Sequence, residues 1–133
     1  MNQNEALLNP RVIVVQKLYG KKFNKDSIVD FPKHRYKKFI KDVVQGTLER
    51  KELIDATIEK HLNQDLDIRK TEILLIILLN AAVFEFLYRP KTSINIIINE
   101  YLNAAKFFVN ESQIKFLNAL LDKISKKLRK YDE

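Results

Sequence analysis

The sequence predicts an all-α protein in which a single domain, residues 1–133, forms a bundle of six to seven helices. The chain contains only 2 Gly and 3 Pro, too few for the frequent turns of an all-β chain. Hydrophobic residues make up 46% and charged residues 31% of the chain, a balance typical of a folded domain with one core. Apolar residues recur every three to four positions along most of the chain, which is the period of an amphipathic helix.

The first predicted helix begins at Asn9-Pro10, because Asn can cap free amides and Pro fits the first helical position. We expect Gly20 to end it, and a polar connection over residues 21–33 to follow. The second helix reaches Leu48 and carries an apolar stripe beneath a basic outer face. That basic segment consists of Lys33, His34, Arg35, Lys37, Lys38 and Lys41. A third helix is expected over residues 53–62.

Asp67 is the expected cap of a fourth helix, which Arg89-Pro90 stops. This helix is apolar nearly all round, so we predict that its neighbours surround it. Ser93 is expected to cap a fifth helix that reaches Ala105. The last helix is predicted to open at Glu111-Ser112 and to continue to residue 128, with either Phe116 or Leu117 facing inward.

Several function classes are disfavoured by what the sequence lacks. The chain has no Cys, which excludes disulfides and thiolate metal sites. His34 and His61 lie far apart among polar residues, so we expect two solvated histidines and no bound metal or cofactor. There is no Gly-rich phosphate loop, no metalloprotease His pair and no nucleophile elbow. We therefore expect a protein that is not an enzyme.

The most apolar stretch, residues 73–79, is followed by Asn80 and Glu85 and falls short of the roughly 20 residues that span a bilayer. Residues 1–10 are polar and do not resemble a signal peptide, so we expect a cytoplasmic protein without a membrane partner. The formal net charge is +7 and comes mostly from Lys. This charge fits an anionic partner such as RNA, and equally fits simple solubility.

The segment INEYLNAAKFFVNESQIKFLNALLDK, residues 98–123, closely resembles the C-terminal signature of the NusB family of bacterial transcription antitermination factors. Three further stretches resemble that family. They are the first helix, with Arg11, Gln16, Leu18 and Tyr19; the pair Ile54-Asp55 with Ile58; and the run Ala82-Val83-Phe84-Glu85. The resemblance therefore extends over most of the chain, from residue 11 to residue 123.

The resemblance implies a bundle of two packed helical sub-bundles and a role in the transcription elongation complex. It further implies a complex with NusE, a ribosomal protein of the small subunit, and binding of boxA, a short single-stranded RNA element of ribosomal RNA transcripts. Such RNA is held by aromatic stacking and by cations along a groove. The candidate RNA-binding residues are Arg11, Gln16, Tyr19, Lys21, Lys22, Lys115, Phe116 and Asn118. Glu85 is the candidate contact to NusE, with an intramolecular hydrogen bond as the alternative, and core packing is the alternative for Tyr19 and Phe116.

The chain also departs from the family pattern. The segment before the first helix lacks the family's Arg cluster, and Asn80, Ala119 and Ser112 replace the family's Arg, Gly and Asp. RNA binding could therefore be weaker, or be carried by lysines in residues 21–41. One alternative is a helical interaction module with weakened or lost RNA binding. Another is the RNA-binding unit of a ribosomal RNA methyltransferase, although the chain is too short for the catalytic domain. A homodimer also stays open.

Overall fold

The computed structural model describes residues 3–129, and within them the chain forms seven α-helices, one short 3-10 turn and no strand. The all-α prediction is therefore confirmed. In chain order the elements are α1 (Gln3–Leu8), α2 (Pro10–Phe23), α3 (Lys37–Glu49), α4 (Lys51–Leu62), η1 (Ile68–Lys70), α5 (Ile73–Tyr88), α6 (Ile94–Ala105) and α7 (Glu111–Leu128).

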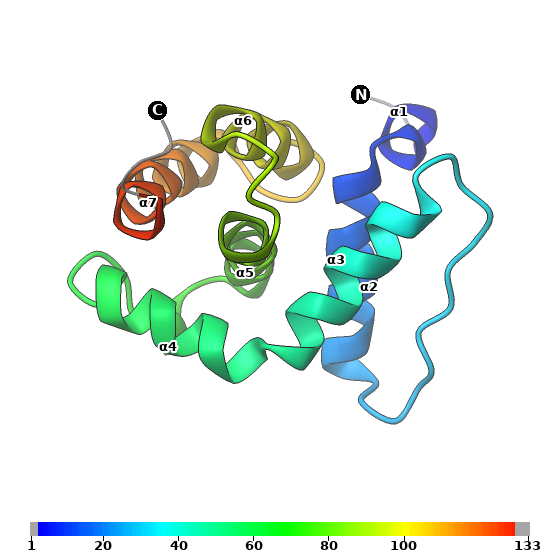
Figure 1. The fold of residues 1–133 in the computed structure, drawn as a ribbon, viewed down its shortest axis with the longest axis horizontal. Helices are drawn as coiled ribbons and strands as arrows, with labels where there is room; N and C mark the ends of the chain where they lie inside the picture. Colours follow the sequence, from blue (N-terminus) through cyan, green and yellow to red (C-terminus); the bar gives the residue numbers. More distant parts are fainter. Residues whose placement is uncertain (1–2, 130–133) are drawn as a thin grey trace.

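Helix α5 is the centre of the bundle, and Figure 1 looks almost along its axis. It packs against α2, α3, α4, α6 and α7. Every residue from Leu75 to Phe86 is buried, as expected for a helix that is apolar on all faces. The two sub-bundles lie on either side of it: α1–α3 form one, and α4, α6 and α7 form the other (Figure 1).

Helices α2 and α3 run side by side in the same direction, joined by residues 24–36, which return along the edge of the molecule (Figure 1). One end of this connection is fixed to the last turn of α1, just before α2, where the His34 Nε2 lies 2.9 Å from the Leu7 carbonyl oxygen. The basic segment at the start of α3 consequently lies near the first turn of α2. The C-terminal ends of both helices meet at the opposite end and line a common pocket.

The helix ends show where the capping predictions succeed and where they fail. Asn9 accepts hydrogen bonds from the first backbone amides of α2, and Ser93 does the same for α6, as predicted. The prediction for Asp67 was wrong, because this residue caps the 3-10 turn, while the Glu72 side chain caps α5. Gly20 does not end α2 either: no Gly here has a positive φ, and the helix continues for another turn to Phe23.

The last helix is fixed at both of its ends. The side chains and backbone amides of Asn110 and Gln113 form a reciprocal capping box at its start. Beyond its other end, the Arg129 guanidinium donates to the carbonyl oxygens of Phe86 at 2.8 Å, Arg89 at 2.8 Å and Glu85 at 3.0 Å. Since the last carbonyls of a helix have no partner within it, Arg129 both caps α5 and ties α7 to it.

His34 is half-buried, and both of its ring nitrogens have hydrogen-bond partners. Its Nδ1 accepts the backbone N–H of Tyr36 at 2.9 Å, so the proton sits on Nε2 and is donated to Leu7.

No group of three or more His, Cys, Asp or Glu side chains that could hold a metal ion occurs among residues 3–129. Within the same range, none of the helices has both the length and the apolarity to cross a membrane.

Candidate functional site

The outer face of α2 carries two adjacent aromatic rings and a polar side chain. Gln16, Tyr19 and Phe23 are separated by three and four positions, so they share one face of the helix. Tyr19 is 39% exposed and Phe23 is 66% exposed. Their ring centroids are 4.8 Å apart. The core alternative for Tyr19 is thereby disfavoured, because Leu18 fills the inward position, and the two exposed rings form a platform on which a base could stack.

The lysines at the end of α2 have different surroundings. The Lys21 ammonium donates to the backbone carbonyls of Lys25 and Ser27, so it organises the turn that follows the helix. Lys22 is exposed and forms no ion pair with any residue that the structure describes. Of these two lysines at the end of α2, Lys22 is the one whose charge is available to a phosphate.

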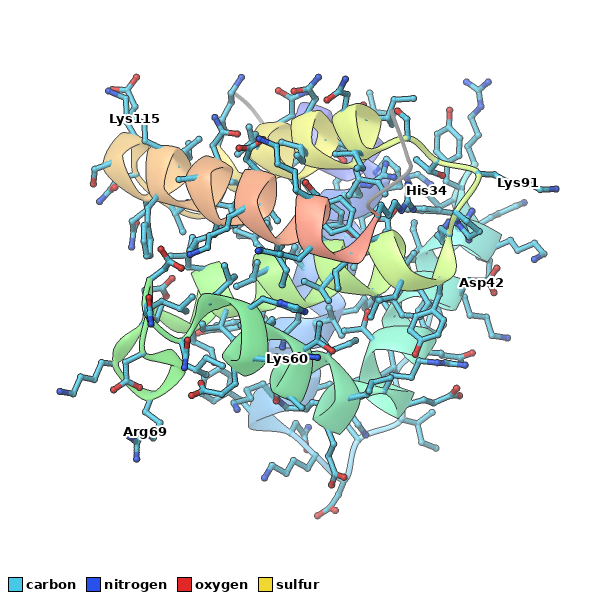
Figure 2. The ribbon with its side chains drawn as sticks, turned by 60° about the vertical axis from the view of Figure 1, so that its left-hand side comes forward. His34, Asp42, Lys60, Arg69, Lys91 and Lys115 are labelled. Carbon is cyan, nitrogen blue, oxygen red and sulfur yellow. The ribbon has the colours of Figure 1, made fainter. Side chains whose placement is uncertain are left out.

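The first two turns of α7 hold the other three candidates. Lys115, Phe116 and Asn118 are all exposed, whereas Leu117 is fully buried. The inward position is thus taken by Leu117, and the Phe116 ring, 38% exposed, faces solvent. Figure 2 shows Lys115 projecting from the N-terminal end of α7. The helix therefore presents a cation, an aromatic ring and an amide on its outer surface.

These residues form two separate groups. We call Gln16, Tyr19 and Lys22 the α2 group, and Lys115, Phe116 and Asn118 the α7 group. Both helices pack against α5 and α6. No ion pair or ring contact joins the two groups within the described part of the chain.

Arg11 and Glu85, the remaining candidates, lie together in the interior. Glu85 is 0% exposed. Its carboxylate accepts hydrogen bonds from Arg11 Nε at 3.0 Å and Nη2 at 2.7 Å, and from the Tyr101 hydroxyl. The Arg11 guanidinium also stacks 4.6 Å from the centroid of the Phe39 ring. This bidentate pair fully engages the carboxylate.

The electrostatics of this cluster follow from burial and from the charge of Glu85. Burial raises the pKa of the Tyr101 hydroxyl well above its ordinary value, and the neighbouring Glu85 carboxylate raises it further. Burial alone would lower the pKa of Arg11, but the hydrogen bond and charge of Glu85 outweigh it and raise that pKa. Arg11 is therefore held charged and Tyr101 neutral.

This geometry changes the interpretation of both residues. Arg11 was expected to contact RNA and Glu85 to contact NusE, but in the structure they pair with each other, Glu85 fully buried and Arg11 at the wall of a pocket. The structure agrees with the alternative for Glu85, which is an intramolecular hydrogen bond. One signal in the sequence pointed to the pairing: Glu85 is a lone carboxylate on an apolar helix, and such a group needs a buried donor.

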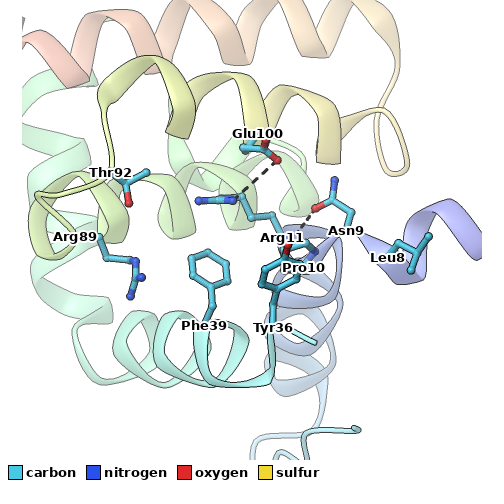
Figure 3. A pocket seen from close by; sticks show the side chains of 9 residues that line it. All are labelled: Leu8, Asn9, Pro10, Arg11, Tyr36, Phe39, Arg89, Thr92 and Glu100. Atoms are coloured by element: carbon cyan, nitrogen blue, oxygen red, sulfur yellow. Dashed lines mark hydrogen bonds and ion pairs between the residues drawn. The ribbon is translucent and has the colours of Figure 1, made fainter. Parts of the chain in front are cut away.

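Sequence reasoning missed an open pocket at the other end of α2, with a volume of about 690 Å³. Figure 3 shows it between α2, α3 and the segment that joins α5 to α6. Two guanidinium groups, those of Arg11 and Arg89, lie 4.6 and 5.0 Å from the Phe39 ring centroid. Glu100 lies 4.0 Å from Arg11 on the opposite wall. Because both signs of charge face this pocket, it does not favour a phosphate.

Comparisons with known proteins agree with this architecture. The model of the NusB family matches residues 8–126. The transcription antitermination protein NusB of Rickettsia massiliae (strain Mtu5) is 36% identical over 107 residues, which is 77% of this chain and 69% of that protein. NusB of Lysinibacillus sphaericus (strain C3-41) is 38% identical over 87 residues, 65% of this chain and 68% of that protein. A solved structure of T. maritima NusB shares the fold, with a TM-score of 0.77, 24% identity and 89% coverage of both chains.

Proposed function

Because the chain belongs to the NusB family, we propose that it binds boxA single-stranded RNA of ribosomal RNA transcripts together with NusE, as part of the transcription elongation complex. The family consists of transcription antitermination factors and not of enzymes, and this chain is a factor of that type. In this proposal residues 1–133 act as one RNA-binding domain in the cytoplasm, where transcripts are made.

The observation that carries the RNA proposal is the exposure of aromatic rings beside unpaired cations at two places. Tyr19 lies beside Lys22 on α2, and Phe116 lies beside Lys115 on α7. Exposed rings offer stacking surfaces to bases of any sequence, and lysines neutralise phosphates. Gln16 and Asn118 add side-chain amides that can read base edges. Each group thus offers the three kinds of contact that hold a single strand.

The role of Glu85 in the NusE complex must be indirect in this arrangement. Its carboxylate holds Arg11 against Phe39, and these two residues form part of the pocket wall shown in Figure 3. We propose that Glu85 shapes this wall and does not itself touch the partner. The partnership with NusE rests on family membership alone.

One observation favours the alternative of weakened RNA binding. Helix α1 has the sequence QNEALL and contains no basic residue, in the region where the family carries its Arg cluster. A binding module of this kind would keep the partner protein and bind boxA RNA weakly or not at all.

A titration separates the two proposals. Fluorescently labelled boxA RNA and a scrambled strand of the same composition are each titrated with the protein, alone and with NusE present, and binding is followed by anisotropy. We expect tighter binding of boxA than of the scrambled strand, and a further gain with NusE. If the protein binds both strands with equal affinity, and if NusE binds without changing that affinity, the interaction module is favoured.

A further inference from the structure

A second pocket, with a volume of about 410 Å³, opens where the C-terminal ends of α2 and α3 meet the first half of α5. This size lies within the range of pockets that hold small ligands. Its floor is apolar and is formed by Leu18, Leu48, Ile73, Ile76 and Ile77. A flat or compact apolar body could therefore be buried there.

Two polar side chains in the wall of this pocket have no hydrogen-bond partner. Asn80 is 7% exposed and Thr47 is 4% exposed, and both line the pocket. The Asn80 Oδ1 and the Thr47 Oγ1 are buried and form no hydrogen bond. Leaving such a group unsatisfied costs about 1–3 kcal/mol. A ligand whose polar groups reached these two atoms would satisfy them.

The rim of the pocket is cationic. Lys21, Lys22, Lys25 and Lys51 line it, and no acidic residue of the described chain does. Lys51 is paired with Asp55 at 2.6 Å, and the Lys21 ammonium is held by two backbone carbonyls. The charges of Lys22 and Lys25 have no carboxylate partner among the described residues. An anionic group at the mouth would meet at least two available ammonium groups.

We propose that this pocket binds a nucleoside phosphate, with the base over the apolar floor and the phosphate at Lys22 and Lys25. A nucleobase supplies both a flat apolar face and edge groups that can pair with Asn80 and Thr47. Inorganic phosphate would leave the apolar floor empty, and an aliphatic acid would leave the two polar groups unsatisfied. The apolar floor and the two polar groups match the face and the edge of a base, and the cationic rim matches the phosphate.

The nucleotide has two sources: a free mononucleotide, or one nucleotide of a bound RNA strand. Around α2, Lys22 lies between Leu18, which forms the pocket floor, and Tyr19, because successive residues are rotated by 100°. A strand stacked on Tyr19 would therefore pass the mouth of the pocket. This second form of the proposal rests on the proposed function, whereas the first does not.

The test follows the Asn80 side-chain amide and the Ile76 and Ile77 methyl groups of the full chain by NMR. Nucleoside 5′-monophosphates, the matching nucleosides and inorganic phosphate are titrated separately. We expect saturable shifts of these signals with the monophosphates and about tenfold weaker binding of the nucleosides, which lack the phosphate. Shifts confined to the lysines, with Asn80 and the Ile methyls unchanged, would overturn the proposal.

The variant Asn80→Leu fills the site and removes the amide, with Asn95→Leu on the exposed face of α6 as the matched control. Because the Asn80 Oδ1 has no partner in the free protein, Asn80→Leu should keep or raise the melting temperature while weakening monophosphate binding about tenfold. An equal loss of boxA affinity identifies an RNA nucleotide as the occupant, and an unchanged boxA affinity identifies a free nucleotide. Unchanged monophosphate binding would refute the site, and monophosphate binding without any RNA binding would refute only the proposed function.

Discussion

Among single residues, the buried Glu85 carboxylate has the strongest influence on the interior. It joins the second residue of α2 to the central helix through Arg11, and joins α6 through Tyr101. Removing one partner of such a group leaves an uncompensated charge in the core. By the same reasoning, Glu85→Lys would place two cations together and is expected to unfold the protein, not merely to weaken a partner complex.

We predict that Glu85→Ala lowers the free energy of unfolding by about 3–5 kcal/mol, because it strands the Arg11 guanidinium. Urea denaturation followed by circular dichroism measures the effect. Glu59→Ala is the matched control, since Glu59 is an exposed carboxylate on α4, and it should change stability by less than about 0.5 kcal/mol. Equal stability of the two variants would mean that the buried pair does not hold the fold together.

Tyr101 gives a prediction about alkaline pH. Burial and the Glu85 charge raise its pKa in the folded state, so folding favours the neutral hydroxyl. The stabilising contribution is complete below the ordinary Tyr pKa of about 10 and is lost as the pH rises toward the folded-state pKa. The difference in unfolding free energy between wild type and Tyr101→Phe should therefore shrink above about pH 10. A difference that stays constant across that range would contradict the coupling.

At the scale of elements, the helices that could be predicted are those whose apolar period and caps agree. Helix α6 starts after Ser93 as predicted, because the Ser side chain accepts the Ile96 amide. Helix α5 was predicted to start too early because Asp67 is as good a cap as Glu72, and only tertiary packing decides which of the two begins the long helix. Helix α1 was missed, since QNEALL is too short to show a period.

The crossing of α3 and α5 gives a prediction with a control in the same chain. A Cβ on Gly46 would lie 2.3 Å from two atoms of the Phe84 ring, which is 6% exposed and packed against Tyr88. We expect Gly46→Ala to destabilise the protein by about 1–3 kcal/mol through this overlap. Gly20→Ala, which meets no atom within 4 Å, should stabilise α2 by up to about 1 kcal/mol. Thermal unfolding of both variants tests the assignment, and a stabilised Gly46→Ala variant would show that the helices can move apart.

At the scale of the whole molecule, the cations are spread over opposite ends. The basic segment begins near the start of α2, whereas Lys22 lies at its C-terminal end, and Figure 2 places Lys115 far from His34. This spread explains why the candidate site could be predicted only in part. Types of residue and helix faces can be read from the sequence, so the exposed members of the α2 and α7 groups were found. The mutual burial of Arg11 and Glu85, 74 positions apart, required the tertiary fold.

We predict that the basic segment contributes to RNA binding and partly replaces the missing N-terminal Arg cluster. Lys33 and Lys37 are exposed and form no ion pair with a described residue. Reversing both charges to Glu should reduce the slope of log affinity against log salt by about 1.4, since each lost contact to a single strand removes about 0.7. Reversal of Lys60 and Lys127, exposed lysines on α4 and α7, is the control. A slope unchanged from wild type would exclude the basic segment from the RNA footprint.

The central claim is that the exposed rings of the α2 and α7 groups stack on the bases of boxA RNA, and alanine substitution tests it most directly. Anisotropy titrations of boxA RNA are compared for wild type, Tyr19→Ala and Phe116→Ala. Tyr88→Ala is the control, because that ring is 38% exposed and lies outside both groups and outside the basic segment. We predict that each of the first two variants loses about 1–3 kcal/mol of binding free energy and keeps its melting temperature. The control should be unaffected. Unchanged RNA affinity together with a lowered melting temperature would show that Tyr19 and Phe116 serve the fold and not the RNA.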